Sequence, residues 1–299
     1  MVEMKQLVVL SGKGGTGKTT VTASLAQSLK PVTLADCDVE APNLHLLIPP
    51  RVERSFSLSV SRKARIDPEA CDGCGACADS CRFGAITGAG IRAVDAFRCE
   101  GCGVCARVCP RDAVSFHEPE GAQVYIGTTP FGPMVGAGLA VGEEASGKVV
   151  SRVRMEAQLL ALDAGLPLVV VDGSPGTGCP VIASMSGADL TLIVTEPSLS
   201  GLHDLERILG VADHFGVPAM VCVNKSDIVP ELTRRIRDRC GTLGIEVVAE
   251  IPFSEAVVES LRRGLPPLGN VPREVEEPLE KLAEAVAERL GEAVTGKRG

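Results

Sequence analysis

The sequence is poor in aromatic residues: its 299 residues include no tryptophan and a single tyrosine, and aromatic residues make up 3% of the chain. It also lacks an excess of basic residues, because 38 acids outnumber 30 lysines and arginines and give a formal net charge of -8. Surfaces that bind nucleic acids rely on clustered lysine and arginine and on rings that stack on bases. We therefore predict that the chain binds neither DNA nor RNA.

Long apolar runs are also missing. The longest, such as Leu166–Val171, fall far short of the ~20 residues that span a bilayer. The N-terminus leads almost directly into Leu7–Leu10 and a glycine loop, so we expect no signal peptide. The stretch 272–294 is amphipathic, but its polar face is more acidic than that of a membrane-surface anchor. These features predict a cytoplasmic protein with no membrane partner.

Cysteine, by contrast, is abundant, with 12 in the chain. Cytoplasmic thiols are kept reduced, so this number indicates metal binding more than a disulfide framework. The four histidines follow no ligand spacing, and we interpret them as structural or solvated: His45, His117, His203 and His214.

Apolar segments of strand length alternate with amphipathic helical stretches in the first 45 residues and again from about residue 150. Strands that are apolar on both faces are typical of a parallel sheet covered by helices on both sides. The predicted strands are Val8–Leu10, Val32–Ala35, Leu168–Val171, Leu190–Thr195, Ala219–Val223 and Val247–Ile251. The predicted helices are 18–29, 151–163, 201–214, 230–242, 254–263 and 275–294. The expected fold is α/β, with a mostly parallel sheet.

The region between these two parts is rich in cysteine and glycine and contains a duplication. CDGCGACADSC at Cys71–Cys81 recurs as CEGCGVCARVC at Cys99–Cys109, with every cysteine displaced by 28 positions. The flanking segments Val52–Val60 and Ala122–Thr128 have the pattern of strands of the host domain, so the duplicated module is inserted. We predict a host domain made of residues 1–61 and 119–299 and an inserted α+β module at 62–118.

The first predicted strand is followed by GKGGTGKTT, which matches the phosphate-binding pattern G-x-x-x-x-G-K-[ST] between a strand and a helix. Glycines let backbone N–H groups surround the phosphates, Lys18 supplies charge to the β- and γ-oxygens, and the Thr19 hydroxyl ligates Mg²⁺. The N-terminus of the following helix adds its positive dipole end. The predicted nucleotide contacts in this loop are Gly12, Lys13, Gly14, Gly15, Thr16, Gly17, Lys18, Thr19 and Thr20.

Acidic residues end two of the predicted strands. Asp172 follows four apolar residues and can hold the magnesium shell, as in P-loop NTPases generally. Asp36 and Asp38 follow the second strand, at the sheet edge where ligands bind in open α/β folds. Two carboxylates there are costly unless they serve a cation or a water. The candidate catalytic residues are Asp38 and Asp172, together with Lys13 and Lys18 of the loop.

A third motif, Asn224-Lys225-Ser226-Asp227, also follows a strand and could contact a purine edge through Asn224 and Asp227. Taken literally, it matches the guanine-reading N-K-x-D pattern of GTPases. From these residues alone, both ATP and GTP remain possible.

These motifs resemble the MinD/ParA/Mrp group of P-loop ATPases, which includes the nitrogenase iron protein. The resemblance depends on the extra lysine of KGGTGKT, on the D-x-D-x-x-x-x-N segment Asp36–Asn43 and on the D-x-x-P-G loop at Asp172–Gly176. It implies a nucleotide-dependent homodimer in which Lys13 reaches the partner's phosphates and Asp38 positions the attacking water or magnesium. It also implies that Asn224 contacts adenine, which favours ATP.

Each half of the duplication carries the C-x2-C-x2-C-x3-C run of bacterial ferredoxins, in which the fourth cysteine ligates the other cluster. One predicted [4Fe-4S] cluster therefore takes Cys71, Cys74, Cys77 and Cys109, and the other takes Cys99, Cys102, Cys105 and Cys81. Zinc is the alternative, but zinc sites rarely need a third cysteine two residues on. Cys37, Cys222 and Cys240 are interpreted as packing residues. Cys179 lies in a glycine-rich loop after Asp172, and both a functional role and that of a plain buried thiol stay open for it.

Together these features predict an ATP-hydrolysing dimer that couples its nucleotide state to electron transfer through two clusters, toward an acceptor protein. A second hypothesis is a cluster-assembly or carrier ATPase, although no C-x-x-C pair lies between Cys222 and Cys240 where the Mrp-type carriers have one. A third is a redox sensor or positioning ATPase in which the clusters only stabilise the insert.

Overall fold

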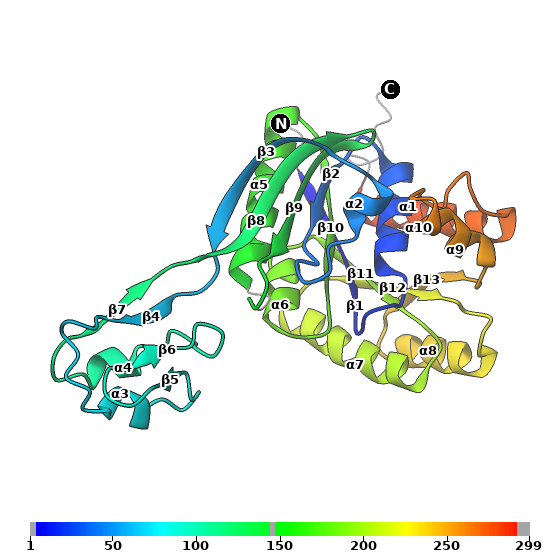
Figure 1. The fold of residues 1–299 in the computed structure, drawn as a ribbon. Coiled ribbons are helices and arrows are strands. Elements are labelled where there is room, and N and C mark those ends of the chain that lie inside the picture. Colours follow the sequence, from blue (N-terminus) through cyan, green and yellow to red (C-terminus); the bar gives the residue numbers. More distant parts are fainter. Residues whose placement is uncertain (1–3, 144–146, 292–299) are drawn as a thin grey trace. The chain divides into compact units, whose positions relative to one another are not determined.

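The computed structural model describes residues 4–143 and 147–291. Within these ranges the chain divides into two compact units (Figure 1). The first holds the residues up to Ser55, Val124–Gly138 and the described residues from 147 onward. The second holds Phe56–Gln123 and the short segment that begins at Leu139, so it is wider than the predicted module at 62–118.

The described strands of the first unit belong to one sheet. They are β1 (Lys5–Ser11), β2 (Thr33–Asp36), β3 (Arg51–Ser59), β8 (Glu120–Thr129), β9 (Gly132–Leu139), β10 (Leu168–Pro175), β11 (Leu190–Thr195), β12 (Ala219–Asn224) and β13 (Glu246–Ile251). The order across the sheet is β13-β12-β11-β1-β10-β2-β9-β8-β3. Neighbouring strands from β13 to β9 pair in parallel. The mostly parallel α/β sheet is therefore confirmed.

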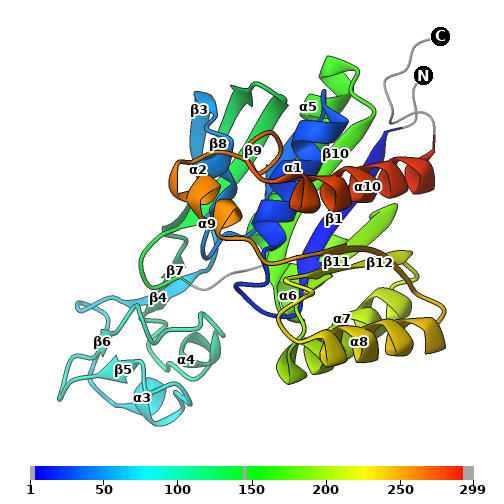
Figure 2. The ribbon, with the colours of Figure 1, turned by 90° about the vertical axis from the view of Figure 1, so that its right-hand side faces the viewer.

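Two helical layers cover this sheet (Figure 2). One contains α1 (Lys18–Leu29), α2 (Leu44–Leu47), α9 (Glu255–Arg262) and α10 (Arg273–Leu290). The other contains α5 (Gly147–Ala164), α6 (Cys179–Met185), α7 (Leu199–His214) and α8 (Pro230–Thr242). The central strands are buried on both faces, which explains why they are apolar at nearly every position.

The last helix is shorter than predicted. It ends at Leu290, and Gly291 follows with a φ of 91°, a conformation that commonly stops a helix. Residues 292–294 of the predicted helix lie outside the described part of the chain. None of the described helices has both the length and the apolar character needed to cross a membrane.

The second unit is small and built around its duplication. β4 (Lys63–Ile66) pairs antiparallel with β7 (Val114–His117), and β5 (Ile86–Thr87) with β6 (Ala93–Val94). The short helices α3 (Ala76–Asp79) and α4 (Val104–Arg107) occupy equivalent positions of the two repeats. Each follows a glycine with positive φ, 86° at Gly75 and 87° at Gly103. The buried core of the unit includes three cysteines, Cys77, Cys99 and Cys105.

Candidate functional site

The loop between β1 and α1 has a backbone suited to surrounding an anion. Gly15 and Gly17 have φ angles of 81° and 96°, which a Cβ atom disfavours. Gly12 packs so closely against Asp204 of α7 that a side chain there would clash. Gly17 precedes α1 without a side-chain cap, so the first N–H groups of this helix remain available to phosphate oxygens.

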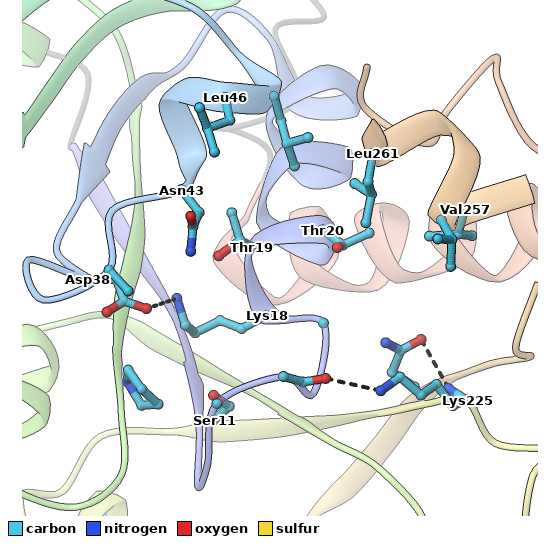
Figure 3. A pocket seen from close by; sticks show the side chains of 18 of the residues that line it. Ser11, Lys18, Thr19, Thr20, Asp38, Asn43, Leu46, Lys225, Val257 and Leu261 are labelled. Atoms are coloured by element: carbon cyan, nitrogen blue, oxygen red, sulfur yellow. Dashed lines mark hydrogen bonds and ion pairs between the residues drawn. The ribbon is translucent and has the colours of Figure 1, made fainter. Parts of the chain in front are cut away.

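Lys18 lies within a buried acidic cluster (Figure 3). Its Nζ is 2.8 Å from Asp172 Oδ1 and 3.4 Å from Asp38 Oδ2. Asp172 is fully buried on β10, and its Oδ2 accepts a hydrogen bond of 2.7 Å from Thr19 Oγ1. The ammonium, hydroxyl and carboxylates expected of a magnesium-phosphate site therefore lie within reach of one another.

Burial and charge together set the ionisation of this cluster. Burial opposes the charge of Lys18, but the carboxylates of Asp172 and Asp38 outweigh it and raise the pKa of Lys18. Burial also raises the pKa of Asp38, and burial with the nearby Asp172 charge raises the pKa of Asp36 well above 3.8. Asp36 accepts hydrogen bonds from the backbone N–H of Asp38 (3.3 Å) and Leu44 (3.2 Å). Asp36 thus holds in place the loop that carries Asp38.

A cavity of about 570 Å³ opens beside Lys18 and has a polar and an apolar end. Of the predicted nucleotide-site residues, those that line it are Gly14, Gly15, Gly17, Lys18, Thr19, Thr20, Asp38 and Asn224. Those outside its lining are Gly12, Lys13, Thr16, Asp172 and Asp227. The apolar end, which the sequence did not indicate, includes Leu46 of α2 and Val257 and Leu261 of α9 (Figure 3). Phe253 also lines the cavity. Phosphates suit the polar end, and a purine ring suits the apolar end.

The motif after β12 mainly braces neighbouring loops. Asn224 Nδ2 donates to Thr16 O at 2.8 Å, and Lys225 Nζ donates to Gly15 O at 3.0 Å, so both hold the phosphate loop. Asp227 Oδ1 accepts a hydrogen bond of 2.7 Å from the Phe253 N–H, which fixes a segment that lines the cavity. The acid that reads guanine in GTPases therefore serves the backbone in this protein.

Because Asp227 is bonded to the Phe253 N–H, its carboxylate is not free to read guanine through a hydrogen bond to a charged group, which contributes about 1.5–3 kcal/mol. We therefore expect no tenfold preference for GTP over ATP. Competition of both nucleotides against a fluorescent ATP analogue measures the preference. Asp227→Ala should weaken both nucleotides to a similar degree, through the loss of the Phe253 contact. A selective loss of GTP affinity in this variant would show that Asp227 reads guanine.

Lys13 lies near the phosphate loop but is bound within its own chain. Its Nζ is 2.8 Å from Glu196 Oε1 and donates to Ser198 Oγ at 3.0 Å and Ser200 Oγ at 2.9 Å. Lys225 Nζ forms a second ion pair with Glu196, at 2.9 Å from its Oε2. Burial opposes the charge of Glu196, but the bonds from both lysines prevail and lower its pKa. No motif had singled out Glu196, because a lone acid after a strand carries no spacing signal.

The cysteines of the second unit line two separate hollows. Cys71, Cys74, Cys77 and Cys109 line one, and Cys81, Cys99, Cys102 and Cys105 line the other. Each hollow thus combines three cysteines of one repeat with the fourth of the other, which is the grouping that the sequence predicts. In the described part of the chain, no three His, Cys, Asp or Glu side chains converge closely enough to hold a single metal ion. Four thiols around an apolar hollow fit a cubane cluster as a donor set.

The other four cysteines fall into two groups. Cys37, Cys222 and Cys240 are fully buried, in agreement with a packing role. Burial raises the pKa of Cys222 to about 12, so its thiol stays neutral. Cys179 is exposed at the start of α6 and is not among the residues that line either hollow.

Comparison with known proteins finds related chains. An uncharacterised protein of Methanocaldococcus jannaschii is 33% identical over 223 residues, which cover 74% of this chain and 78% of that relative. The iron-sulfur cluster carrier protein of the same organism is 23% identical over 280 residues, covering 87% and 77%.

The fold is similar to that of the septum site-determining protein MinD of Pyrococcus horikoshii, solved in complex with Mg-ADP. That structure is 20% identical, has a TM-score of 0.59 and covers 97% of this chain and 99% of its own. The sequence profile of the CobQ/CobB/MinD/ParA nucleotide binding domain matches residues 7–268. Because this match spans most of the chain and includes the phosphate loop and its acids, the chain belongs to the CobQ/CobB/MinD/ParA family of nucleotide-binding ATPases.

Proposed function

We propose that this ATPase uses its nucleotide state and its dimerisation to control electron transfer through two [4Fe-4S] clusters held by a bacterial-ferredoxin-like second unit. The observation that carries the proposal is the pair of hollows, each lined by four cysteines, in the same chain as a complete phosphate loop. Cluster iron needs thiolate ligands and a reducing environment, which favours the cytoplasm.

In the proposed ATP complex, each residue of the buried cluster has a separate task. Lys18 meets the β- and γ-phosphates, and Thr19 ligates Mg²⁺. Asp172 holds the magnesium shell, for which its hydrogen bond with Thr19 Oγ1 already orients it. Asp38, at the cavity wall, positions the attacking water or the metal.

Dimerisation gives Lys13 its proposed role. As in the MinD/ParA/Mrp group, Lys13 would reach the phosphates bound by a second copy. To do so it must leave Glu196, Ser198 and Ser200, and Glu196 would then keep Lys225 as its partner. The γ-phosphate of ATP adds the negative charge that can compete with Glu196, which links dimer formation to the nucleotide state.

The clusters would supply one-electron chemistry, and the chain supplies their ligands: Cys71, Cys74, Cys77 and Cys109 for one cluster, and Cys99, Cys102, Cys105 and Cys81 for the other. Strands β3 and β8 continue from the first unit into the second, so the chain itself connects nucleotide and cluster sites. An equilibrium that nucleotide shifts in one unit can thereby alter cluster reduction in the other, and the coupling must be reciprocal.

A second candidate is a cluster carrier or assembly ATPase, which the likeness to the iron-sulfur cluster carrier protein favours. In that case a cluster would leave the chain for an acceptor apoprotein. Transfer of iron to apo-aconitase, measured as recovered aconitase activity, separates this function from electron transfer.

The proposal predicts about eight irons per chain in anaerobically purified protein, from two four-iron clusters. Potentiometric titrations without nucleotide, with ADP and with a slowly hydrolysed ATP analogue should give different cluster potentials. Coupling of about 1–3 kcal/mol is typical of allosteric proteins, and 1.4 kcal/mol corresponds to about 59 mV for one electron.

Two outcomes would contradict the proposal in different ways. Zinc in place of iron would remove the cluster assignment. Full iron content with identical potentials in the three nucleotide states would keep the clusters but remove their coupling to ATP, and delivery of a cluster would then be the better account.

A further inference from the structure

The two repeats differ on the outward side of their short helices. In the second repeat, Val104 and Arg107 of α4 are exposed, as is Val108, the residue that follows the helix. The equivalent positions of the first repeat, 28 residues earlier, are Ala76, Asp79 and Ser80. An acid and two small residues of the first repeat therefore correspond to a base and two larger apolar residues of the second. Since both helices follow a cluster-binding loop of the same spacing, packing around the cluster does not require the difference.

This outward side of α4 borders a hollow of about 570 Å³. Its lining includes Arg62, Cys102, Val104, Arg107 and Val108, which we call the α4 face. Val104 and Val108 are 41% and 37% exposed and lie side by side in the lining of this hollow. Cys102, one of the proposed ligands, lines this hollow as well as that of its own cluster.

Two guanidinium groups give the α4 face its positive charge. Arg62 is held in place, because its Nε donates to Gly101 O at 2.7 Å and its guanidinium lies 4.7 Å from the Phe116 ring centre. Arg107 is exposed and forms no ion pair with any described residue. A fixed and a free arginine beside two valines make a small basic-rimmed apolar patch on a chain whose net charge is -8.

We propose that the α4 face is the docking surface for an acidic one-electron carrier protein, and that electrons enter through the cluster of Cys81, Cys99, Cys102 and Cys105. This inference rests on the proposed cluster-binding function. The reduced carrier loses one electron and that cluster gains it, with no other reactant. Complementary charge steers such partners and fixes their orientation, and electron-transfer encounters need only a small interface.

The internal duplication supplies a matched pair of variants. The triple variant Val104→Ala, Arg107→Asp and Val108→Ser gives α4 the residues of α3, which already fold beside a cluster loop. The reciprocal variant, Ala76→Val, Asp79→Arg and Ser80→Val, makes the opposite change on the first repeat. Both are tested as full-length, cluster-loaded chains, with iron content and circular dichroism as checks on folding.

Stopped-flow mixing with reduced flavodoxin, an acidic one-electron donor, measures the second-order rate of cluster reduction. We expect the rate to fall with rising ionic strength, and the α4 variant to be about tenfold slower at low salt. The reciprocal variant should stay within about twofold of the unchanged chain, and reduction by dithionite, which needs no docking, should be equal in all three.

Several results would overturn the inference while leaving the clusters in place. An equal and opposite effect of the reciprocal variant would show that only net charge matters. A faster rate in the reciprocal variant alone would move the entry point to the other cluster. A change in oligomer mass of the α4 variant, with an unchanged flavodoxin rate, would make the α4 face a contact between copies of this chain. Failure of dithionite to reduce any cluster would instead count against the proposed function.

Discussion

Lys18→Ala is expected to weaken ATP binding strongly. The Lys18 ammonium is buried between Asp172 and Asp38 and provides the charge proposed to meet the phosphates. Truncating one partner of a buried, hydrogen-bonded charge pair costs about 2–5 kcal/mol, a loss of roughly 30-fold or more in affinity. Calorimetric titration with Mg-ATP measures it directly. The comparison variant is Lys225→Ala, which should weaken binding less, because Lys225 supports the phosphate loop through Gly15 O and Glu196 and lies nearer to solvent than Lys18.

The same variant should change how stability depends on pH. Attraction to Lys18 lowers the pKa values of Asp36 and Asp38 against the larger effect of burial, so removing the ammonium raises both further. A carboxyl whose pKa is higher in the folded state contributes full stability below its unfolded value near 3.8 and loses that contribution as pH rises through the folded value. Lys18→Ala should therefore lose stability more steeply than the unchanged chain from about pH 4 upward.

Urea unfolding at several pH values tests this dependence. Recovery of stability at low pH, together with weakened ATP binding where the variant is still folded, separates the binding role of Lys18 from its role in folding. Unchanged ATP affinity in a folded Lys18→Ala chain would contradict the assignment of the phosphate site.

The sequence predicted the central sheet well because its strands are buried on both faces. Leu190–Thr195, for example, was predicted with the bounds that the structure gives β11. β9 (Gly132–Leu139) was missed, because its three glycines weaken the strand pattern. Gly136 is needed there: a Cβ atom at this position would clash with the Tyr125 ring.

The candidate site was predictable where its chemistry is local in sequence. The phosphate loop and the cysteine runs are contiguous motifs, so spacing alone identified them. Glu196 and the apolar end of the cavity depend on segments that only the folded sheet brings beside the phosphate loop. Asp227 matched a nucleotide motif, yet its carboxylate bonds to the Phe253 N–H, a contact that no linear pattern reveals.

If each cluster takes three cysteines from one repeat and the fourth from the other, a crossed grouping, then Cys109→Ala should remove the same cluster as Cys71→Ala. The two residues line the same hollow, although 38 positions separate them in the sequence. Each single variant should retain about four of eight irons, because the other four cysteines line a separate hollow. Cys222→Ala is the control, since this buried thiol on β12 lies in neither hollow and should leave iron content unchanged.

Double variants decide between crossed and sequential grouping. If Cys71 and Cys109 bind one cluster, replacing both removes no more iron than replacing either, so about four irons remain. Replacing Cys71 and Cys81 together should remove nearly all iron, because these two belong to different hollows. A sequential grouping, in which each repeat binds its own cluster with its own four cysteines, reverses both results. Iron analysis of these two double variants under anaerobic conditions therefore tests the ligand assignment without depending on ATP, dimerisation or any partner protein.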